Sequence, residues 1–282
     1  MRTTVADVQK MKVNGERIPM LTVYDCSSTL IAERAGVPLL LVGDSLGMVM
    51  MGYDTTLPVT VTDMERHAAA VMRVSKQALV VADLPFLSYA TVEDAISSAR
   101  RLMQNTGVQA VKLEGGASIV PQVRRLTESG VPVMGHLGLT PQSQHQIGLK
   151  VQARRADEAR CLLEDALAIE AAGAFALVLE VVPAPLAEAV SRRLRIPVIG
   201  IGAGAGCDGQ VQVWHDILGL FEGRPPRHAG QYAAIGAAME DAVRAYATDV
   251  RNGAFPTEKH SAQMEAAELT AALAAVTSSN EA

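Results

Sequence analysis

The sequence is poor in features that mark several large classes of protein. Its three cysteines, Cys26, Cys161 and Cys207, are widely spaced, odd in number and contain no CxxC pair, which indicates reduced thiols in a cytoplasmic protein rather than a disulfide framework. It has no cluster of basic residues, and its formal net charge is −5. We therefore expect neither nucleic acid nor an anionic membrane surface as a partner.

Long apolar runs are also missing. No run approaches the ~20 residues that span a bilayer, and the amino-terminal MRTTVADVQKMK lacks the apolar core of a signal peptide. No low-complexity linker or change of composition divides the chain. These absences leave a globular protein, and 282 residues are enough for one large α/β domain.

The chain does contain a repeated pattern in which an apolar run is followed by polar residues. The stretch Pro38–Leu46, PLLLVGDSL, shows it most clearly. Its apolar run has neither helical nor alternating periodicity, which predicts a strand buried on both faces. Similar runs predict eight strands in all, at Met20–Tyr24, Leu39–Gly43, Ala78–Asp83, Ala110–Leu113, Val131–Gly135, Ala176–Glu180, Pro197–Ile201 and Asp216–Leu220.

Segments compatible with helices lie between these strands, the last of them at Gly209–Trp214. Such alternation over roughly 250 residues predicts a (β/α)8 TIM barrel. A doubly wound open sheet is the alternative, because periodicity cannot distinguish a closed sheet from an open one. We expect a single barrel domain over residues 1–261, capped at its bottom by a helix at Thr4–Asn14, and a carboxyl-terminal extension over 262–282 that is helical or disordered.

Charged side chains follow the predicted strands at one end, which is where ligands bind in α/β folds. Asp44, Asp83 and Glu114 end three neighbouring strands, and His215 and Asp216 lie near the eighth. Three converging carboxylates repel one another unless a cation lies among them. Oxygen ligands of this kind fit Mg²⁺, which takes one or two carboxylates together with water and substrate. Zinc is disfavoured because the chain has no HxH, HExxH or cysteine–histidine spacing.

Three further residues at strand ends complete the candidate site. Lys112 shares a strand face with Glu114 and is placed to hold a substrate carboxylate. Glu180 lies between the apolar segments ALVL and VVPAP, which should desolvate its carboxylate and make it a stronger base. His136 could polarise a carbonyl or hold a ligand. Taken singly, each has a structural alternative as a cap, a turn former or half of an ion pair.

Long motifs carry a resemblance to a known family. They are TVYD, LLLVGDSLGMVMMGYDTTLPVTVTDMERH, VADLPFLSYAT, AVKLEGG, VPVMGHLGLTPQS, LVLEVVP, IPVIGIGAG and DGQVQVWHDILGL. Together they resemble ketopantoate hydroxymethyltransferases from about Thr3 to Ser261.

The resemblance implies an enzyme with a (β/α)8 barrel and one Mg²⁺ per subunit. It would transfer a hydroxymethyl group from 5,10-methylenetetrahydrofolate to 3-methyl-2-oxobutanoate through a Mg-bound enolate, giving 2-dehydropantoate for pantothenate biosynthesis. By matched motif, the implied metal ligands are Asp44 and Asp83 with Glu114 as a further acid of the metal shell, the base is Glu180, and the keto acid is surrounded by Asp44, Ser45, Asp83, Lys112 and His136. Members of the family are typically decamers, which implies a homo-oligomer.

Two alternatives belong to other classes of function. One is a Mg-dependent carbon–carbon lyase or mutase of the phosphoenolpyruvate mutase and isocitrate lyase type. It predicts a catalytic cysteine in a KKCGH-like loop, which the sequence lacks. The other is a catalytically silent barrel, which would be expected to have lost some of the charged residues at the strand ends; here all six matched positions are intact.

Overall fold

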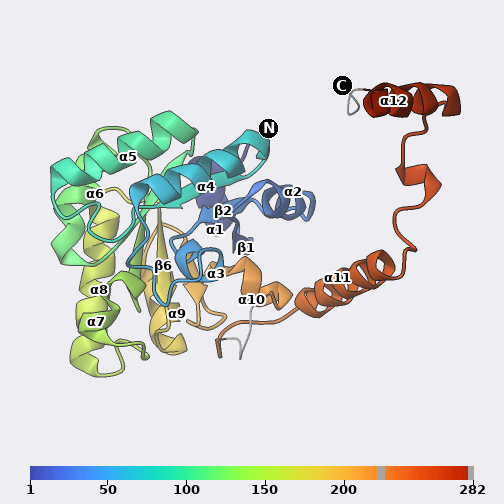
Figure 1. Ribbon diagram of the computed structural model, residues 1–282. Coiled ribbons are helices and arrows are strands. Elements are labelled where there is room, and N and C mark those ends of the chain that lie inside the picture. Colours follow the sequence, from blue (N-terminus) through green and yellow to red (C-terminus); the bar gives the residue numbers. More distant parts are fainter. Residues whose placement is uncertain (221–225, 279–282) are drawn as a thin grey trace. The chain divides into compact units, whose positions relative to one another are not determined.

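The computed structural model describes residues 1–220 and 226–278 (Figure 1). Its strands are parallel, pair in chain order and close into a barrel, because β8 also pairs with β1. They are β1 (Ile18–Thr22), β2 (Leu39–Val42), β3 (Leu79–Asp83), β4 (Ala110–Glu114), β5 (Val133–Gly138), β6 (Ala176–Glu180), β7 (Val198–Ile201) and β8 (Gly209–Gln212). The closure confirms the predicted (β/α)8 fold and excludes the open sheet.

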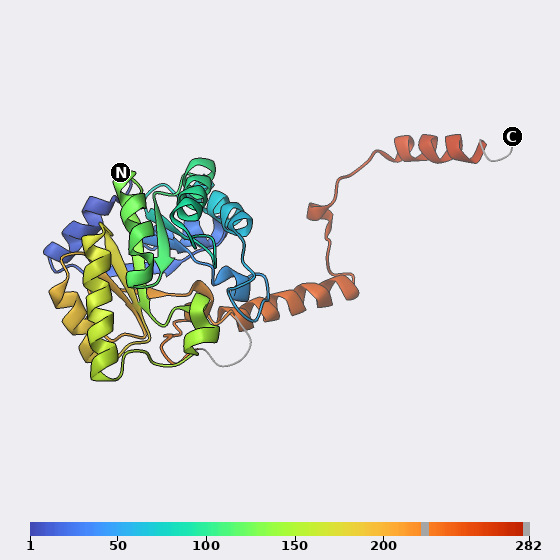
Figure 2. The same ribbon diagram turned by 90° about the vertical axis from the view of Figure 1, so that its left-hand side faces the viewer.

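Helices surround the strands of the barrel, as two views at right angles show (Figures 1 and 2). They are α1 (Val5–Val13), α2 (Cys26–Arg34), α3 (Leu46–Val49), α4 (Val61–Val74), α5 (Val92–Thr106), α6 (Val120–Glu128), α7 (Gln144–Ile147), α8 (Ala156–Ala171), α9 (Ala184–Arg193) and α10 (Trp214–Leu218), with short 3₁₀ turns η1 (Ala117–Ile119) and η2 (Pro141–Ser143). Buried apolar residues of α2, α4, α5, α6, α8 and α9 form one core cluster with side chains of the strands.

The last strand of the barrel differs from the prediction. The sequence predicted a helix over Gly209–Trp214 and a strand over Asp216–Leu220, and this assignment was wrong. The order is reversed, because β8 occupies Gly209–Gln212 and α10 occupies Trp214–Leu218.

Close packing against β1 explains why the strand was missed. A Cβ atom at Gly209 would collide with the carbonyl oxygen and Cβ of Ile18, so a glycine that looks like a strand breaker is required there. Val211 is buried while Gln210 is exposed, so β8 has a single apolar face and lacks the continuous apolar run of the other strands. The apolar WHDIL segment instead makes a short helix that ends at Gly219, with φ of 62°.

The first helix closes the amino-terminal end of the barrel. It begins with a capping box in which Thr4 and Asp7 satisfy each other's backbone N–H groups. Its Val8 is fully buried and belongs to the same cluster inside the barrel as Ile18 and Leu39, the first residues of β1 and β2. The opposite, carboxyl-terminal end of the strands is therefore the one left for a binding site.

The chain divides into two compact units, residues 1–233 and 234–282. The second contains α11 (Ile235–Arg251), η3 (Glu258–His260) and α12 (Ala266–Ser278). Within it the rings of Tyr246 and Phe255 meet edge to face with centroids 5.6 Å apart. The expected domain limits, 1–261 and 262–282, stay a prediction. Among the described helices there is none long and apolar enough to cross a membrane.

A buried carboxylate fastens α2 to the segment that leads into β3. Oε1 of Glu33 accepts a hydrogen bond from the Ser75 hydroxyl at 2.7 Å and from the backbone N–H groups of Lys76, Gln77 and Ala78, each at 2.9 Å. Burial raises the pKa of this carboxyl, but the backbone donors outweigh burial and hold the pKa below its ordinary value.

Replacing this carboxylate should destabilise the fold in a pH-dependent way. Glu33→Gln is expected to lower the free energy of unfolding at pH 7 by about 1.5–3 kcal/mol, the range for hydrogen bonds to a charged group. Because the folded-state pKa is lowered, the stabilisation is present above the ordinary pKa and is lost as the pH falls through the folded-state value. Urea unfolding should show the difference at pH 7 and a smaller one below about pH 4. Exposed Glu128 of α6 offers the control Glu128→Gln, and equal stability of wild type and Glu33→Gln at pH 7 would contradict the assignment.

Candidate active site

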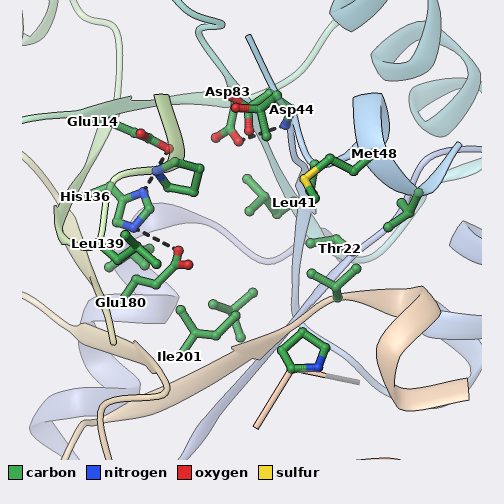
Figure 3. Close-up of a pocket in the computed structure, with 18 of the residues that line it drawn as sticks. Thr22, Leu41, Asp44, Met48, Asp83, Glu114, His136, Leu139, Glu180 and Ile201 are labelled. Carbon is green, nitrogen blue, oxygen red and sulfur yellow. Dashed lines mark hydrogen bonds and ion pairs between the residues drawn. The ribbon is translucent and has the colours of Figure 1, made fainter. Parts of the chain in front are cut away.

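Charged side chains from five neighbouring strands line one cavity of about 410 Å³ at the carboxyl ends of the strands (Figure 3). They are Asp44 two residues after β2, Asp83 at the end of β3, Lys112 and Glu114 in β4, His136 in β5 and Glu180 at the end of β6. Ser45 lines the same cavity. The structure thus brings together every site residue that the sequence predicted.

The register of the parallel strands explains how these groups meet. Pairing of β3 with β4 sets Asp83 opposite Lys112, and Nζ lies 3.0 Å from Oδ1. Pairing of β4 with β5 sets Glu114 opposite His136, and Nδ1 lies 3.3 Å from Oε1. On the next strand Glu180 Oε2 lies 3.2 Å from His136 Nε2. Glu114, His136 and Glu180 therefore form a continuous row along one wall of the cavity (Figure 3).

Besides the row Glu114–His136–Glu180, the site contains a pair of buried aspartates. Asp44 and Asp83 are 4% and 2% exposed, and the backbone N–H of Asp44 donates to Asp83 Oδ2 at 3.0 Å. Burial raises the pKa of Asp44, and the nearby charges of Asp83 and Glu114 raise it further. Burial also raises the pKa of Asp83, although Lys112 opposes the effect. Both carboxylates therefore lie where a negative charge is costly.

The two cationic groups are held charged by their neighbours. Burial lowers the pKa of Lys112, but the carboxylates of Asp83, Glu114 and Asp44 outweigh it and raise that pKa above its ordinary value. Burial and Lys112 lower the pKa of His136, whereas Glu114 and Glu180 raise it, with a net result of about 9. The imidazole therefore favours its charged form at neutral pH and forms ion pairs with both glutamates, while its Nδ1 also lies 3.2 Å from Lys112 Nζ. Burial raises the pKa of Glu114, but His136 and Lys112 bring it below the ordinary value.

The charges of the site do not balance. Four carboxylates meet only two cationic groups here, so full ionisation would leave two negative charges in excess in a largely buried place. Uncompensated charge of this kind is expensive to bury, and one divalent cation would neutralise it.

The available oxygen atoms fit a hard divalent ion. Asp83 Oδ1 is buried and has no hydrogen bond of acceptable geometry, although the Lys112 ammonium lies 3.0 Å away. Across residues 1–220 and 226–278, no group of three or more His, Cys, Asp or Glu side chains is arranged to hold a metal. Mg²⁺ needs only one or two carboxylates, because water and substrate complete its octahedral shell. Asp44 and Asp83 would supply these two, and Glu114 points to His136 instead (Figure 3).

Gln142 lies in the η2 turn after β5 and contacts both Glu114 and Asp44. It was not predicted as a site residue from the sequence. Its Nε2 donates to Asp44 Oδ2 at 2.8 Å and to the Leu84 carbonyl at 3.0 Å, and its backbone N–H donates to Glu114 Oε2 at 3.0 Å. The Tyr89 hydroxyl donates to Gln142 Oε1 at 2.6 Å. The Leu84 carbonyl can only accept, so the amide has one possible orientation. The TPQS motif contained this residue, but nothing in its spacing indicated a contact with Asp44.

Ser45 is positioned by the segment after β1. Its hydroxyl lies 2.9 Å from the hydroxyl of Tyr24, which is 1% exposed. Ser45 also precedes the short helix α3, which places its side chain at the cavity wall next to Asp44. A hydroxyl so fixed can bind one substrate oxygen without a loss of rotamer freedom on binding.

Comparison with known proteins identifies the family. The model of the ketopantoate hydroxymethyltransferase family matches residues 2–258. The chain belongs to this family. Membership confirms the resemblance seen in the motifs, and it makes the protein a hydroxymethyltransferase of pantothenate synthesis.

Curated relatives agree with the family model. A 3-methyl-2-oxobutanoate hydroxymethyltransferase of Gluconacetobacter diazotrophicus is 70% identical over 273 residues, 97% of this chain and 99% of that protein. An enzyme of the same name from Chloroflexus aurantiacus is 60% identical over 273 residues, 97% of each protein.

Solved structures show that the barrel is shared more widely than the ketopantoate hydroxymethyltransferase family. A 2,3-dimethylmalate lyase of the PEP mutase/isocitrate lyase superfamily has a TM-score of 0.57 at 18% identity, covering 95% of this chain and 94% of its own. A phosphonopyruvate hydrolase has a TM-score of 0.61 at 13% identity, covering the same shares. At such low identity the similarity concerns the fold alone.

Proposed function

We propose that the chain transfers a hydroxymethyl group from 5,10-methylenetetrahydrofolate to 3-methyl-2-oxobutanoate and so forms 2-dehydropantoate. The observation that most supports this is the row Glu114–His136–Glu180 beside a buried lysine and two buried aspartates, in a chain of this family. In the balanced reaction the C3–H bond breaks and C3 bonds to the methylene carbon. Water supplies the hydroxyl oxygen, and tetrahydrofolate leaves.

Glu180 is proposed to take the proton from C3. It lines the cavity, and its side chain is 16% exposed, so it is open to a ligand. The imidazole of His136 holds the Glu180 carboxylate in place through the ion pair between Nε2 and Oε2. His136 thus acts on the keto acid through Glu180, since its Nε2 faces Glu180 and its Nδ1 lies between Glu114 and Lys112.

Lys112 and Ser45 are proposed to bind the keto acid. The Lys112 ammonium faces the cavity and is held in position by Asp83. It can therefore bind the carboxylate of the keto acid without a change of rotamer. Asp44 and Asp83 would hold Mg²⁺, and Glu114 would support the ion from further out because Gln142 contacts both Glu114 and Asp44. When bound, the ion would supply Lewis-acid stabilisation of charge on the keto-acid oxygens.

A direct assay tests the proposal against the lyase or mutase alternative. The protein with Mg²⁺, 3-methyl-2-oxobutanoate and 5,10-methylenetetrahydrofolate should yield 2-dehydropantoate, detected by proton NMR. With 2,3-dimethylmalate in place of both substrates, no cleavage is expected. Cleavage without any hydroxymethyl transfer would favour the lyase, and inertness in both mixtures would favour the silent barrel.

Gln142 provides a test of the metal assignment that does not depend on turnover. Gln142→Leu removes the hydrogen bond to Asp44, and groups that orient a metal ligand typically contribute ~10–100-fold to metal affinity. The dissociation constant for Mn²⁺, a spectroscopic stand-in for Mg²⁺, should rise by about that factor in EPR titrations. Gln144 of α7 lines the cavity too, so Gln144→Leu is the matched control. Equal Mn²⁺ affinity in wild type and Gln142→Leu would show that Gln142 does not orient Asp44 for metal binding.

Two other expectations go with the proposed function. A homo-oligomer, by resemblance a decamer, and a location in the cytoplasm both stay predictions. The three cysteines are unpaired, as a reducing compartment requires.

A further inference from the structure

One buried carboxylate of the cavity has no part in the mechanism above. Asp216 of α10 lines the cavity and is 6% exposed. Within residues 1–220 and 226–278, its carboxylate accepts no hydrogen bond and forms no ion pair. Burial raises its pKa, and His228, another residue of the cavity wall, opposes this only in part. A buried carboxylate of this kind requires hydrogen-bond donors, and the described residues supply none.

The fold places Asp216 across the cavity from Lys112 and His136. In the closed barrel, β8 and β1 lie opposite β4 and β5, which carry Lys112 and His136. The backbone N–H of Trp214 donates to Thr22 Oγ1 at 2.9 Å, which fixes the start of α10 to the end of β1. Figure 3 shows Thr22 across the cavity from His136.

The cavity wall between Asp216 and the side that carries His136 is apolar and suits a flat ring. Val178, Ile201, Val211 and Val213 line it. The cavity volume of about 410 Å³ is in the range of sites for drug-sized ligands. It is larger than a five-carbon keto acid would fill.

We propose that Asp216 binds the pyrimidine edge of the pterin ring of the folate. This rests on the proposed function and names a contact for its second substrate. That edge presents two adjacent donors, the N3–H and the 2-amino group, and one carboxylate can accept both in parallel. The reactive methylene is carried at N5 and N10, at the far side of the ring from this edge. With the edge on Asp216, the methylene faces the base and the keto acid on the opposite wall.

The test separates the two substrates. Asp216→Asn keeps one acceptor but turns a donor toward the 2-amino group, so the affinity for tetrahydrofolate by calorimetry should fall about 10–100-fold. Exchange of the C3 hydrogen of 3-methyl-2-oxobutanoate with solvent, measured without folate, should stay within threefold of wild type. Asp54 is an exposed acid of the same cavity, so Asp54→Asn controls for the loss of one negative charge and should leave both values within threefold.

A change in the ligand tests the same contact without any variant. A tetrahydrolumazine carries an oxygen in place of the 2-amino group and would oppose a carboxylate with an acceptor. Wild type should bind the corresponding tetrahydropterin at least 10-fold more tightly, and Asp216→Asn should lose that preference.

Unchanged tetrahydrofolate affinity in Asp216→Asn would overturn the proposal, as would equal affinity of wild type for the two pteridines. Loss of C3 exchange in a folded Asp216→Asn would also overturn it, because Asp216 would then act on the keto acid. Absence of C3 exchange in wild type is a different result, since it counts against the proposed function itself.

Discussion

Glu180→Gln is expected to abolish exchange of the C3 hydrogen of 3-methyl-2-oxobutanoate with solvent. General bases contribute about 10²–10⁴-fold to the steps that they catalyse, so we expect a loss of at least 100-fold in the exchange rate. The amide keeps the size of the side chain and can still accept a hydrogen bond from His136 Nε2, 3.2 Å away in wild type. Proton NMR in D₂O measures the rate directly.

Binding of the keto acid distinguishes loss of the base from loss of the site. The affinity of Glu180→Gln for 3-methyl-2-oxobutanoate with Mg²⁺ should stay close to that of wild type, because Lys112 and Ser45 are untouched. Glu188 is a partly exposed glutamate of α9 that contacts Arg192 outside the cavity, so Glu188→Gln is the control and should exchange at the wild-type rate. Full exchange in Glu180→Gln would assign the base to another residue.

Asp44→Asn should weaken metal binding and stabilise the metal-free protein at the same time. The loss of a charged ligand is expected to reduce Mg²⁺ affinity by at least ~100-fold, since one of only two proposed carboxylate ligands becomes neutral. Burial and the charges of Asp83 and Glu114 raise the pKa of Asp44, so its negative charge is unfavourable in the metal-free fold. The neutral amide should therefore raise the free energy of unfolding by about 0.5–2 kcal/mol, as is usual where a functional site is relieved of strain.

Asp44→Asn is expected to lower the Mg²⁺ affinity and to raise the free energy of unfolding. The opposite signs of these two effects make the prediction specific. Isothermal titration with Mg²⁺ and urea unfolding in the presence of a chelator would measure them on one preparation. Asp54→Asn again serves as the control, because Asp54 lines the cavity but is exposed. Unchanged Mg²⁺ affinity in Asp44→Asn would contradict the metal assignment, and lower stability without metal would show that repulsion is not the dominant interaction at Asp44.

Most of the barrel could be predicted from the sequence because seven strands are largely apolar runs. Their order then fixes which strand ends are neighbours, so convergence of Asp44, Asp83 and Glu114 followed from the fold class alone. The eighth strand could not be found in this way. Gly209 is required by the close approach of Ile18, a contact between segments about 190 residues apart, and the run GQVQ is apolar on one face only.

The contacts within the site depended on tertiary structure. Sequence spacing placed His136 at a strand end, but its engagement of Glu114 and Glu180 follows from the strand register. Gln142 reaches Asp44 from 98 residues away in the sequence, and no local pattern shows such a contact. Asp216 was expected near the last strand and lies in the helix after it, which leaves it at the same end of the barrel.

Deuterium exchange at C3 of 3-methyl-2-oxobutanoate in wild-type protein, without folate, tests the central claim most directly. Proton NMR in D₂O would follow the loss of the C3 hydrogen with Mg²⁺ and with a chelator instead. We predict exchange that requires Mg²⁺ and needs no folate, because Glu180, Lys112 and the two aspartates act on the keto acid alone. Exchange at equal rates with the chelator would contradict the metal assignment, and no exchange under either condition would contradict the proposed base and substrate together.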